Sequence, residues 1–262
     1  KNPSVWKEYE HRGERFRLRI APAVLELACS SEPQGQSRIV FPGEREQLVA
    51  MSLRALVVEK RAAVEVTTIG ESAVVKVVFR AGDVRSVLCC YGHTFSHAEV
   101  MDSFRVMAHA SVDFEHIVPG RAPRRMVVRY FHQFCEDGGR LYVELNRFES
   151  ERLLSGEFRA YDHSAWMQLR DPLARWLFLF LQIENRGAAK PDPWGKSNGF
   201  RFDLGMLTQR GLISSAMRIR QAVPRVRRAL ELLGKRGFLH RSNTCVGFDE
   251  EIQRQSSGPG RP

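Results

Sequence analysis

The sequence has little that would hold a chain in a membrane or cross-link it by disulfides. It contains 5 cysteines among 262 residues, an odd number with no recurring spacing, which indicates reduced thiols rather than a disulfide framework. No apolar run reaches the length of about 18 residues that a bilayer requires; the most apolar stretch, Leu177–Ile183, predicts a buried helix instead. A secretory signal sequence is not apparent either. We therefore expect a cytoplasmic protein without a membrane partner.

Motifs of several enzyme classes are missing as well. The chain has no GxxxxGK[ST] phosphate loop, which argues against an intrinsic ATPase. Cys89, Cys90, His93 and His97 lie close in sequence, but adjacent cysteines on a helix point apart, whereas zinc ligands must converge. The two histidines also lack the His-hydrophobe-His spacing of a rolling-circle nickase, and paired carboxylates fall in a turn and at a domain junction. We predict a protein that is not an enzyme and that binds neither a metal nor a cofactor.

Positive charge is what the chain has in excess. Its 40 Lys and Arg residues outnumber 30 Asp and Glu residues, which gives a net charge of +10. Such a balance favours a polyanionic partner, either nucleic acid or an anionic membrane surface. The hydrophobic fraction of 43% can support real cores, and a chain of this length makes one large or two small domains.

The most informative segment is Ser214–Arg236. Apolar residues recur in it at helical spacing from Ile219 to Leu233, which predicts a helix with one buried stripe. The opposite face and its flanks are rich in arginine, as in a helix that enters a DNA groove. The alternative is an ordinary solvated basic helix. The residues that we predict to contact DNA from this helix are Arg218, Arg220, Gln221, Arg225, Arg227, Arg228 and Lys235.

Two neighbouring features bear on this helix. A short amphipathic segment, Phe202–Arg210, precedes it across a predicted tight turn at Gly211, and this is the order of a helix-turn-helix. Pro224 interrupts the pattern, because proline lacks an N–H and crowds the carbonyl four residues earlier. Either the helix is kinked at Pro224, or a short turn ends near Gln221 and the main helix starts at the proline.

The first predicted domain begins with helices. Apolar spacing indicates a helix over Glu44–Glu59, a strand over Ala73–Phe79 and a helical stripe over Val84–Tyr91. Ser96 and Glu99 then form the capping box of a further helix. Its expected exposed face, His97, Glu99, Asp102 and Ser103, is poor in cations, so this domain uses another element for DNA or serves dimerisation instead.

Extended segments follow these helices. They are predicted at Ser111–Ile117, Met126–Phe134 and Arg140–Leu145, with turns between them. Helices followed by a hairpin with a basic tip are in winged-helix order. In that interpretation the tip contacts phosphates or inserts into a minor groove; the alternative is a solvated turn. The arginines of this predicted wing are Arg121, Arg124 and Arg125.

The second predicted domain is mainly helical. A long helix over Ser164–Asn185 is interrupted at Asp171-Pro172, where the proline can occupy the first turn of a second helical piece. Trp166 and Trp176 belong to its apolar face, whereas Trp194 lies in a polar loop. The helix-turn-helix follows, and residues 238–248 make a second, shorter wing. The expected fold is therefore α+β, with two tandem winged-helix domains. The boundaries are an arm and linker over 1–38, domains over 39–148 and 149–248, and a disordered tail over 249–262.

Three segments resemble plasmid replication initiators of the IncQ type. GGRLYVELNRF (138–148) is similar to the segment that closes their first winged-helix domain. RIRQAVPRVRRALELLGKRGF (218–238) is similar to the recognition helix of their second domain, and it departs from that pattern at Pro224. FPGEREQLVAMSLRALVVE (41–59) resembles the opening of a plasmid-initiator first domain.

This resemblance implies a function for the whole chain. Such a protein binds repeated origin sites (iterons) in double-stranded plasmid DNA, helps to open the adjacent duplex and recruits a host helicase or its loader. The resemblance does not imply a catalytic site. A homodimer through the first domain is a separate expectation, from the cation-poor helix face described above. The alternatives are a winged-helix transcriptional repressor, which binds without melting DNA, and a DNA-processing nickase, which needs a divalent metal and leaves a strand break.

Overall fold

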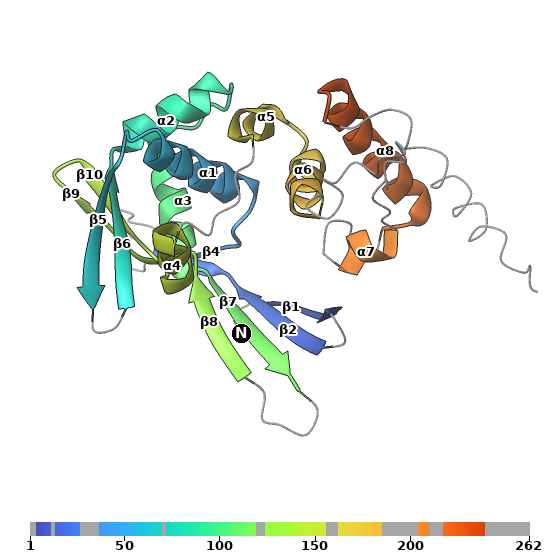
Figure 1. Ribbon diagram of the computed structural model, residues 1–262, viewed down its shortest axis with the longest axis horizontal. Helices are drawn as coiled ribbons and strands as arrows, with labels where there is room; N and C mark the ends of the chain where they lie inside the picture. Colours follow the sequence, from blue (N-terminus) through green and yellow to red (C-terminus); the bar gives the residue numbers. More distant parts are fainter. Residues whose placement is uncertain are drawn as a thin grey trace, which may run out of the picture. The chain divides into compact units, whose positions relative to one another are not determined.

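The computed structural model describes residues 4–11, 14–26, 37–69, 72–118, 124–155, 162–184, 204–209 and 217–238. They form helices and antiparallel sheets, as expected for an α+β protein (Figure 1). The chain divides into two compact units, residues 1–163 and 164–262. This division falls later than the predicted boundary at 148/149, because the helix that begins at Arg147 packs on a sheet of the first unit.

The first unit contains three antiparallel sheets in its described residues. Sheet A has the strand order β1-β2-β7-β8, sheet C has the order β5-β6-β10-β9, and β3 pairs with β4. Four of these strands come from the segment around residues 1–38 that we expected to be an arm and linker. The strands are β1 (Val5–His11), β2 (Glu14–Ala21), β3 (Ala23–Glu26), β4 (Ser37–Val40), β5 (Ala63–Ile69), β6 (Ser72–Phe79), β7 (Ser111–Ile117), β8 (Arg124–Arg129), β9 (Phe131–Asp137) and β10 (Arg140–Leu145).

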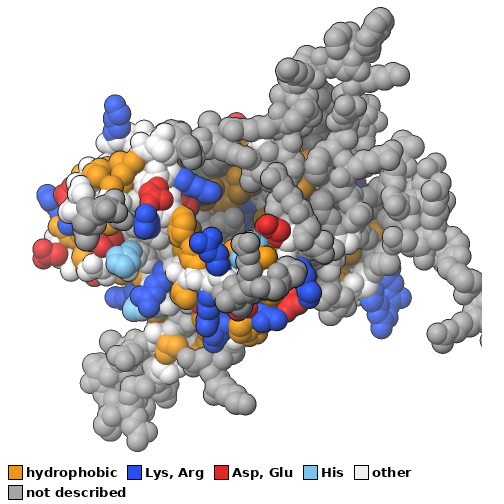
Figure 2. All heavy atoms as spheres, turned by 60° about the horizontal axis from the view of Figure 1, so that its bottom comes forward, with side chains coloured by type: hydrophobic (Ala, Val, Ile, Leu, Met, Phe, Trp, Pro, Cys, Tyr) orange, Lys and Arg blue, Asp and Glu red, His pale blue; other side chains and the backbone are white. Residues whose placement is uncertain are grey.

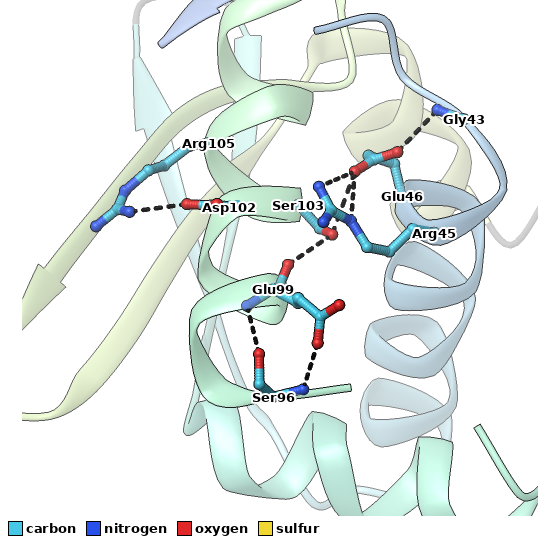
Figure 3. Close-up of polar contacts among 8 residues, drawn as sticks. All are labelled: Gly43, Arg45, Glu46, Ser96, Glu99, Asp102, Ser103 and Arg105. Carbon is cyan, nitrogen blue, oxygen red and sulfur yellow. Dashed lines mark hydrogen bonds and ion pairs between the residues drawn. The ribbon is translucent and has the colours of Figure 1, made fainter. Parts of the chain in front are cut away.

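Three of the four helices described in the first unit lie where apolar spacing and capping predicted them, whereas the helix over Arg147–Ser155 was not predicted from the sequence. The capping box at the start of α3 is confirmed: the Ser96 hydroxyl accepts the Glu99 N–H at 3.2 Å, and the Glu99 carboxylate accepts the Ser96 N–H at 2.7 Å (Figure 3). These hydrogen bonds to its charged form lower the pKa of Glu99. The helices are α1 (Glu44–Val58), α2 (Ala81–Cys90), α3 (His97–His109) and α4 (Arg147–Ser155).

The core of this unit lies between the helices and sheet C. Side chains alternate along a strand, so Val75, Val77 and Phe79 of β6 all point to the same face and are buried. The ring of Phe79 lies 5.0 Å from that of Phe104 on α3, and the ring of Phe131 on β9 lies 5.8 Å from the same Phe104 ring. The helices therefore fix the strands of sheet C in place.

The predicted extended segment Met126–Phe134 is wrong as a single strand. Strand β8 ends at Arg129 in sheet A, and β9 begins at Phe131 in sheet C. Asn146 holds this crossover, because its side-chain amide donates to the carbonyls of Arg129 and Tyr130 at 3.0 and 3.2 Å. The chain changes sheets here because Phe131 is fully buried in the core, whereas Arg129 stays exposed.

Sheet A has two unlike faces. One, here called the ladder face, carries alternating charges in register across the four strands, from Glu8 through Arg17 and Glu115 to Arg125. The opposite face, here called the apolar face, carries rows such as Leu18, Phe114 and Met126. In Figure 1 this sheet extends away from α1, α2 and α3.

The second unit consists of helices in its described part. The predicted interruption at Asp171-Pro172 is confirmed: Pro172 is the first residue of α6, and the Asp171 carboxylate caps it by accepting the Ala174 N–H at 2.9 Å. Trp166 is fully buried, whereas Trp176 is half-buried and stacks on Phe180. The helices are α5 (His163–Gln168), which starts at the boundary, α6 (Pro172–Glu184), α7 (Leu204–Gln209) and α8 (Ile219–Lys235). Trp194, the predicted second wing beyond Phe238 and the tail lie outside the described residues.

Candidate nucleic-acid interface

Helix α8 is the strongly amphipathic element that the sequence predicted. Helix α8 packs against α6. The buried stripe of α8 consists of Ala222, Val226, Ala229 and Leu233. Val223, which was predicted on this stripe, is only half-buried, like Leu230. The two alanines were missed as core residues because alanine is a weak apolar signal in sequence. Their small side chains allow the two helices to approach closely.

The opposite face of α8 presents the predicted cations to solvent. No ion pair of the described residues involves any of the cations at positions 218, 220, 225, 228 and 235. Their charges are therefore available to an external anion. The predicted DNA-contacting residues that are exposed on this helix and at its N-cap are Arg218, Arg220, Gln221, Arg225, Arg227, Arg228 and Lys235.

The ends of α8 are well defined. Arg218 is the N-cap, and its carbonyl accepts the N–H groups of Gln221 and Ala222 at 2.8 and 3.1 Å. At the other end, the Arg236 guanidinium donates to the Gln168 side-chain oxygen of α5 at 2.7 Å. The Phe238 ring packs edge-on against Phe178 of α6, with ring centres 4.8 Å apart. Arg236 is itself exposed, and its guanidinium is engaged by a side chain of the second unit.

The structure decides between the two alternatives at Pro224. The helix runs without a break from Ile219 to Lys235 and contains the proline in its second turn. The alternative in which a turn ends near Gln221 and the main helix starts at Pro224 is therefore wrong. Pro224 is exposed, on the same side of the helix as the cations.

The predicted tight turn between the two helices is not tested by the described residues. Helix α7 ends at Gln209 and α8 begins at Ile219. Gly211, the predicted turn residue, lies outside the described residues.

Two of the three arginines of the predicted wing, Arg124 and Arg125, lie in strand β8 of sheet A. Arg124 is exposed at the start of β8, and Arg121 lies outside the described residues. Arg125 donates to the Asp113 carboxylate at 2.8 Å, and Arg19 reaches the same carboxylate at 3.5 Å. The Asp113 side chain is only 11% exposed. Arg125 is therefore already neutralised within the ladder face, whereas Arg124 keeps its charge free.

Helix α3 offers no comparable basic face. Ser103 was predicted to be exposed, but it is fully buried, because it faces α1 and donates to the Glu46 carboxylate at 3.3 Å. Glu46 also accepts the Gly43 N–H at 2.8 Å and pairs with Arg45. Figure 3 shows these contacts between α1 and α3. The solvent side of α3 includes Asp102, which is already paired with the one arginine of the helix, so the helix has no excess of cations.

The cysteine and histidine cluster is divided between different environments. Cys89 and Cys90 are exposed at the end of α2, His93 is buried, and His97 is exposed at the start of α3. Across the part of the chain that the structure describes, no three His, Cys, Asp or Glu side chains are grouped so that they could hold a metal ion. None of the helices described is long and apolar enough to cross a membrane.

Charge on the surface is mixed rather than uniformly basic. Figure 2 shows Lys and Arg side chains on one face of the molecule interspersed with hydrophobic and acidic ones. Ion pairs within sheet A join cations and carboxylates, such as those of Arg17 with Glu8 at 2.9 Å and with Glu115 at 3.2 Å. Both carboxylates raise the pKa of Arg17. Helix α8 differs because its cations at positions 218, 220, 225, 228 and 235 form no ion pair with any carboxylate that the structure describes.

Comparison with known proteins identifies a structural likeness and no sequence family. No family model matches the chain, and no curated protein sequence matches it. A crystal structure of domains 2 and 3 of RctB, in selenomethionine form, matches with a TM-score of 0.55 and 11% identity, over 88% of this chain and 78% of that chain. A second crystal structure of RctB domains 2–3 matches with a TM-score of 0.52 and 10% identity, over 88% and 77%.

These values establish a shared fold. They extend over both compact units of the chain, because the matched share is nearly nine-tenths of its length. The likeness is to RctB domains rather than to an IncQ-type initiator, so the IncQ assignment rests on the sequence motifs alone.

Proposed function

We propose that this protein is a replication initiator that binds double-stranded DNA through the exposed basic face of α8. RctB, whose domains 2 and 3 share the fold, is a replication initiator. The observation that carries the proposal is the set of exposed cations at positions 218, 220, 225, 228 and 235, which pair with no carboxylate of the described residues, on a helix whose buried stripe packs against α6.

The geometry of α8 suits the major groove. A groove about 12 Å wide admits one α-helix, and side chains on the outward face then reach base edges and phosphates. Arg225 and Arg228 are the residues assigned to bases, whereas the flanking cations contact phosphates and supply most of the affinity. Because α6 and α5 hold the other side and the end of the helix, these side chains are presented on a rigid element.

The first unit has a supporting role in this proposal. The order α1, β6, α2, α3, β9, β10, with β10 between β6 and β9 in sheet C, supports a winged helix into which other strands are inserted.

The apolar face of sheet A supports the expected homodimer. Its residues Leu18 and Phe114 are only half-buried and Met126 is exposed, although one face of an antiparallel sheet normally packs on apolar partners. A second copy of the same face is the occupant that we assign to it.

Iteron recognition, origin opening in plasmid DNA and recruitment of a host helicase or its loader complete the proposal. The three sequence motifs of the IncQ type support them. Initiation differs from simple repression in requiring that bound protein deform the adjacent duplex, which is easiest in A/T-rich DNA.

The test of DNA binding uses Arg225→Ala and Arg228→Ala in the full chain. Each substitution should weaken binding by about 1–3 kcal/mol at a selected duplex and relax specificity there. Fluorescence anisotropy with a duplex selected from random sequences, and with its scrambled version, measures both effects. Arg236→Ala is the matched control, because that arginine is held by Gln168 and should not contribute. Equal losses on both duplexes would assign the two arginines to phosphates, and no loss at all would refute the proposal.

A further inference from the structure

Pro224 occupies a position in α8 that its packing does not explain. It is exposed and lies on the outward side of the helix, away from the buried line of Ala222 and Val226. Residues three and four positions away are neighbours on a helix surface. The neighbours of Pro224 are therefore Arg220, Gln221, Arg227 and Arg228, which are all exposed.

A proline in this place weakens the helix. It has no N–H, so it cannot donate to the carbonyl of Arg220, and its ring crowds that carbonyl. The helix nevertheless continues through it to Lys235. Because Pro224 is exposed, it adds no packing to the core. What it does provide is a rigid apolar ring at the centre of a surface that otherwise consists of cations and a glutamine amide.

We propose that Pro224 is a specificity-determining residue that contacts the C5-methyl group of a thymine in the major groove. This inference rests on the proposed function of α8 and deepens it by naming a base. Thymine alone presents a methyl group in the major groove, and apolar side chains recognise it by contact. The ring cannot form a hydrogen bond, so it discriminates against the amino group that cytosine presents at the neighbouring position.

The surrounding side chains fit the same arrangement. Gln221, on one side of the ring, has the amide that pairs with an adenine edge, and Arg228, on the other side, has the fork that pairs with guanine or phosphate. The apolar contact is thus flanked by two hydrogen-bonding groups, each about one helical turn from the ring and about two turns from each other. Such a row matches a short run of neighbouring bases that includes a thymine.

The test compares thymine with uracil, which differs only by the methyl group. Random-sequence duplexes are selected on the full chain, and the tightest duplex is then synthesised with each thymine replaced singly by deoxyuracil. For the wild-type protein, one replacement should lower affinity about fourfold, the factor expected for one buried methyl group. For Pro224→Ala the effect of that replacement should be clearly smaller, because the ring atoms beyond Cβ that reach the methyl group are absent.

Controls separate this inference from the proposal beneath it. Gln221→Ala should weaken binding yet keep the sensitivity to uracil, and Pro224→Ala should melt at the same or a higher temperature, because alanine restores the helical N–H. Two results would overturn the role of Pro224 while DNA binding itself would stand. Either the wild-type protein binds selectively but loses no affinity at any deoxyuracil, or Pro224→Ala loses as much affinity at deoxyuracil as the wild-type protein does. Failure of the selection to enrich any duplex would overturn both.

Discussion

At the scale of single residues, Asp113 decides how much of the charge on sheet A is available to a partner. Its carboxylate is shared by the guanidiniums of Arg19 and Arg125, and both arginines lie partly in solvent. Arg19 also lies over the ring of Trp6, at 5.4 Å. The carboxylate therefore holds in place two cations that would otherwise attract phosphate.

Removing that carboxylate charge should strengthen non-specific DNA binding. With Asp113→Asn the two arginines become free to release counterions from DNA, so the salt dependence of binding should steepen by about one unit for each new phosphate contact. The free energy of unfolding should fall at the same time, because the arginines lose a shielded partner. Binding to a scrambled duplex at several salt concentrations measures the slope. Glu8→Gln, which alters a more exposed ion pair, is the control and should change the salt dependence little. An unchanged slope for Asp113→Asn would show that these arginines do not reach DNA.

At the scale of elements, the junction between sheets A and C depends on one side chain. Asn146 donates to two carbonyls at the crossover, and its own side-chain oxygen accepts the Glu149 N–H at 3.0 Å at the start of α4. Ser150 of the same helix accepts the Val75 N–H of β6 at 3.2 Å. The crossover and α4 are therefore positioned together.

Replacing Asn146 by alanine should destabilise the first unit. The substitution leaves acceptors and a helix N-terminus without their partner, which costs about 1–3 kcal/mol. Urea unfolding followed by circular dichroism measures the change. Gln47→Ala, at an exposed site on α1, is the control and should be close to neutral. A loss equal to that of the control would mean that strand pairing alone maintains the crossover.

Sequence patterns predicted some elements and missed others for identifiable reasons. Helices α1, α2 and α3 were found because apolar spacing and the Ser96 capping box agree, whereas α4 was missed because its sequence, RFESERLLS, is mostly polar. The alternation in Arg15–Ile20, RFRLRI, is a strand pattern, yet its high charge was interpreted as an arm. The break at Tyr130 carries no glycine or proline, so only the burial of Phe131 reveals it. At the candidate interface the cations of α8 were predictable, whereas the partner of Arg125 is remote in space and not visible in sequence.

At the scale of the whole molecule, two compact units in one chain favour binding over a long stretch of DNA. When one unit is bound, the other is held at a high effective concentration near the neighbouring duplex. A net charge of +10 adds a sequence-independent attraction. The energy of several contacts can then offset the cost of deforming one segment of DNA.

This organisation predicts opening of DNA without nucleotide hydrolysis. The full chain should protect more than one helical turn, and on a supercoiled origin plasmid it should make thymines in adjacent A/T-rich DNA reactive to permanganate. Relaxed plasmid is the control, because it lacks the stored twist that helps to open the duplex. Tight binding without reactive thymines would favour a repressor, and a metal-dependent nick would contradict the prediction that the protein is not an enzyme.

The two buried alanines of α8 have a consequence for how such a protein changes its target. Ala222 and Ala229 fix the rotation of α8 about its long axis. A larger side chain at either position would push one edge of the helix away from α6. Outward residues such as Arg228 can therefore be substituted one at a time while the rotation of the helix stays the same. Substitutions at the outward positions can therefore change the base preference of the helix without changing its packing. A larger residue at either alanine would instead rotate the helix and move all of its outward side chains together.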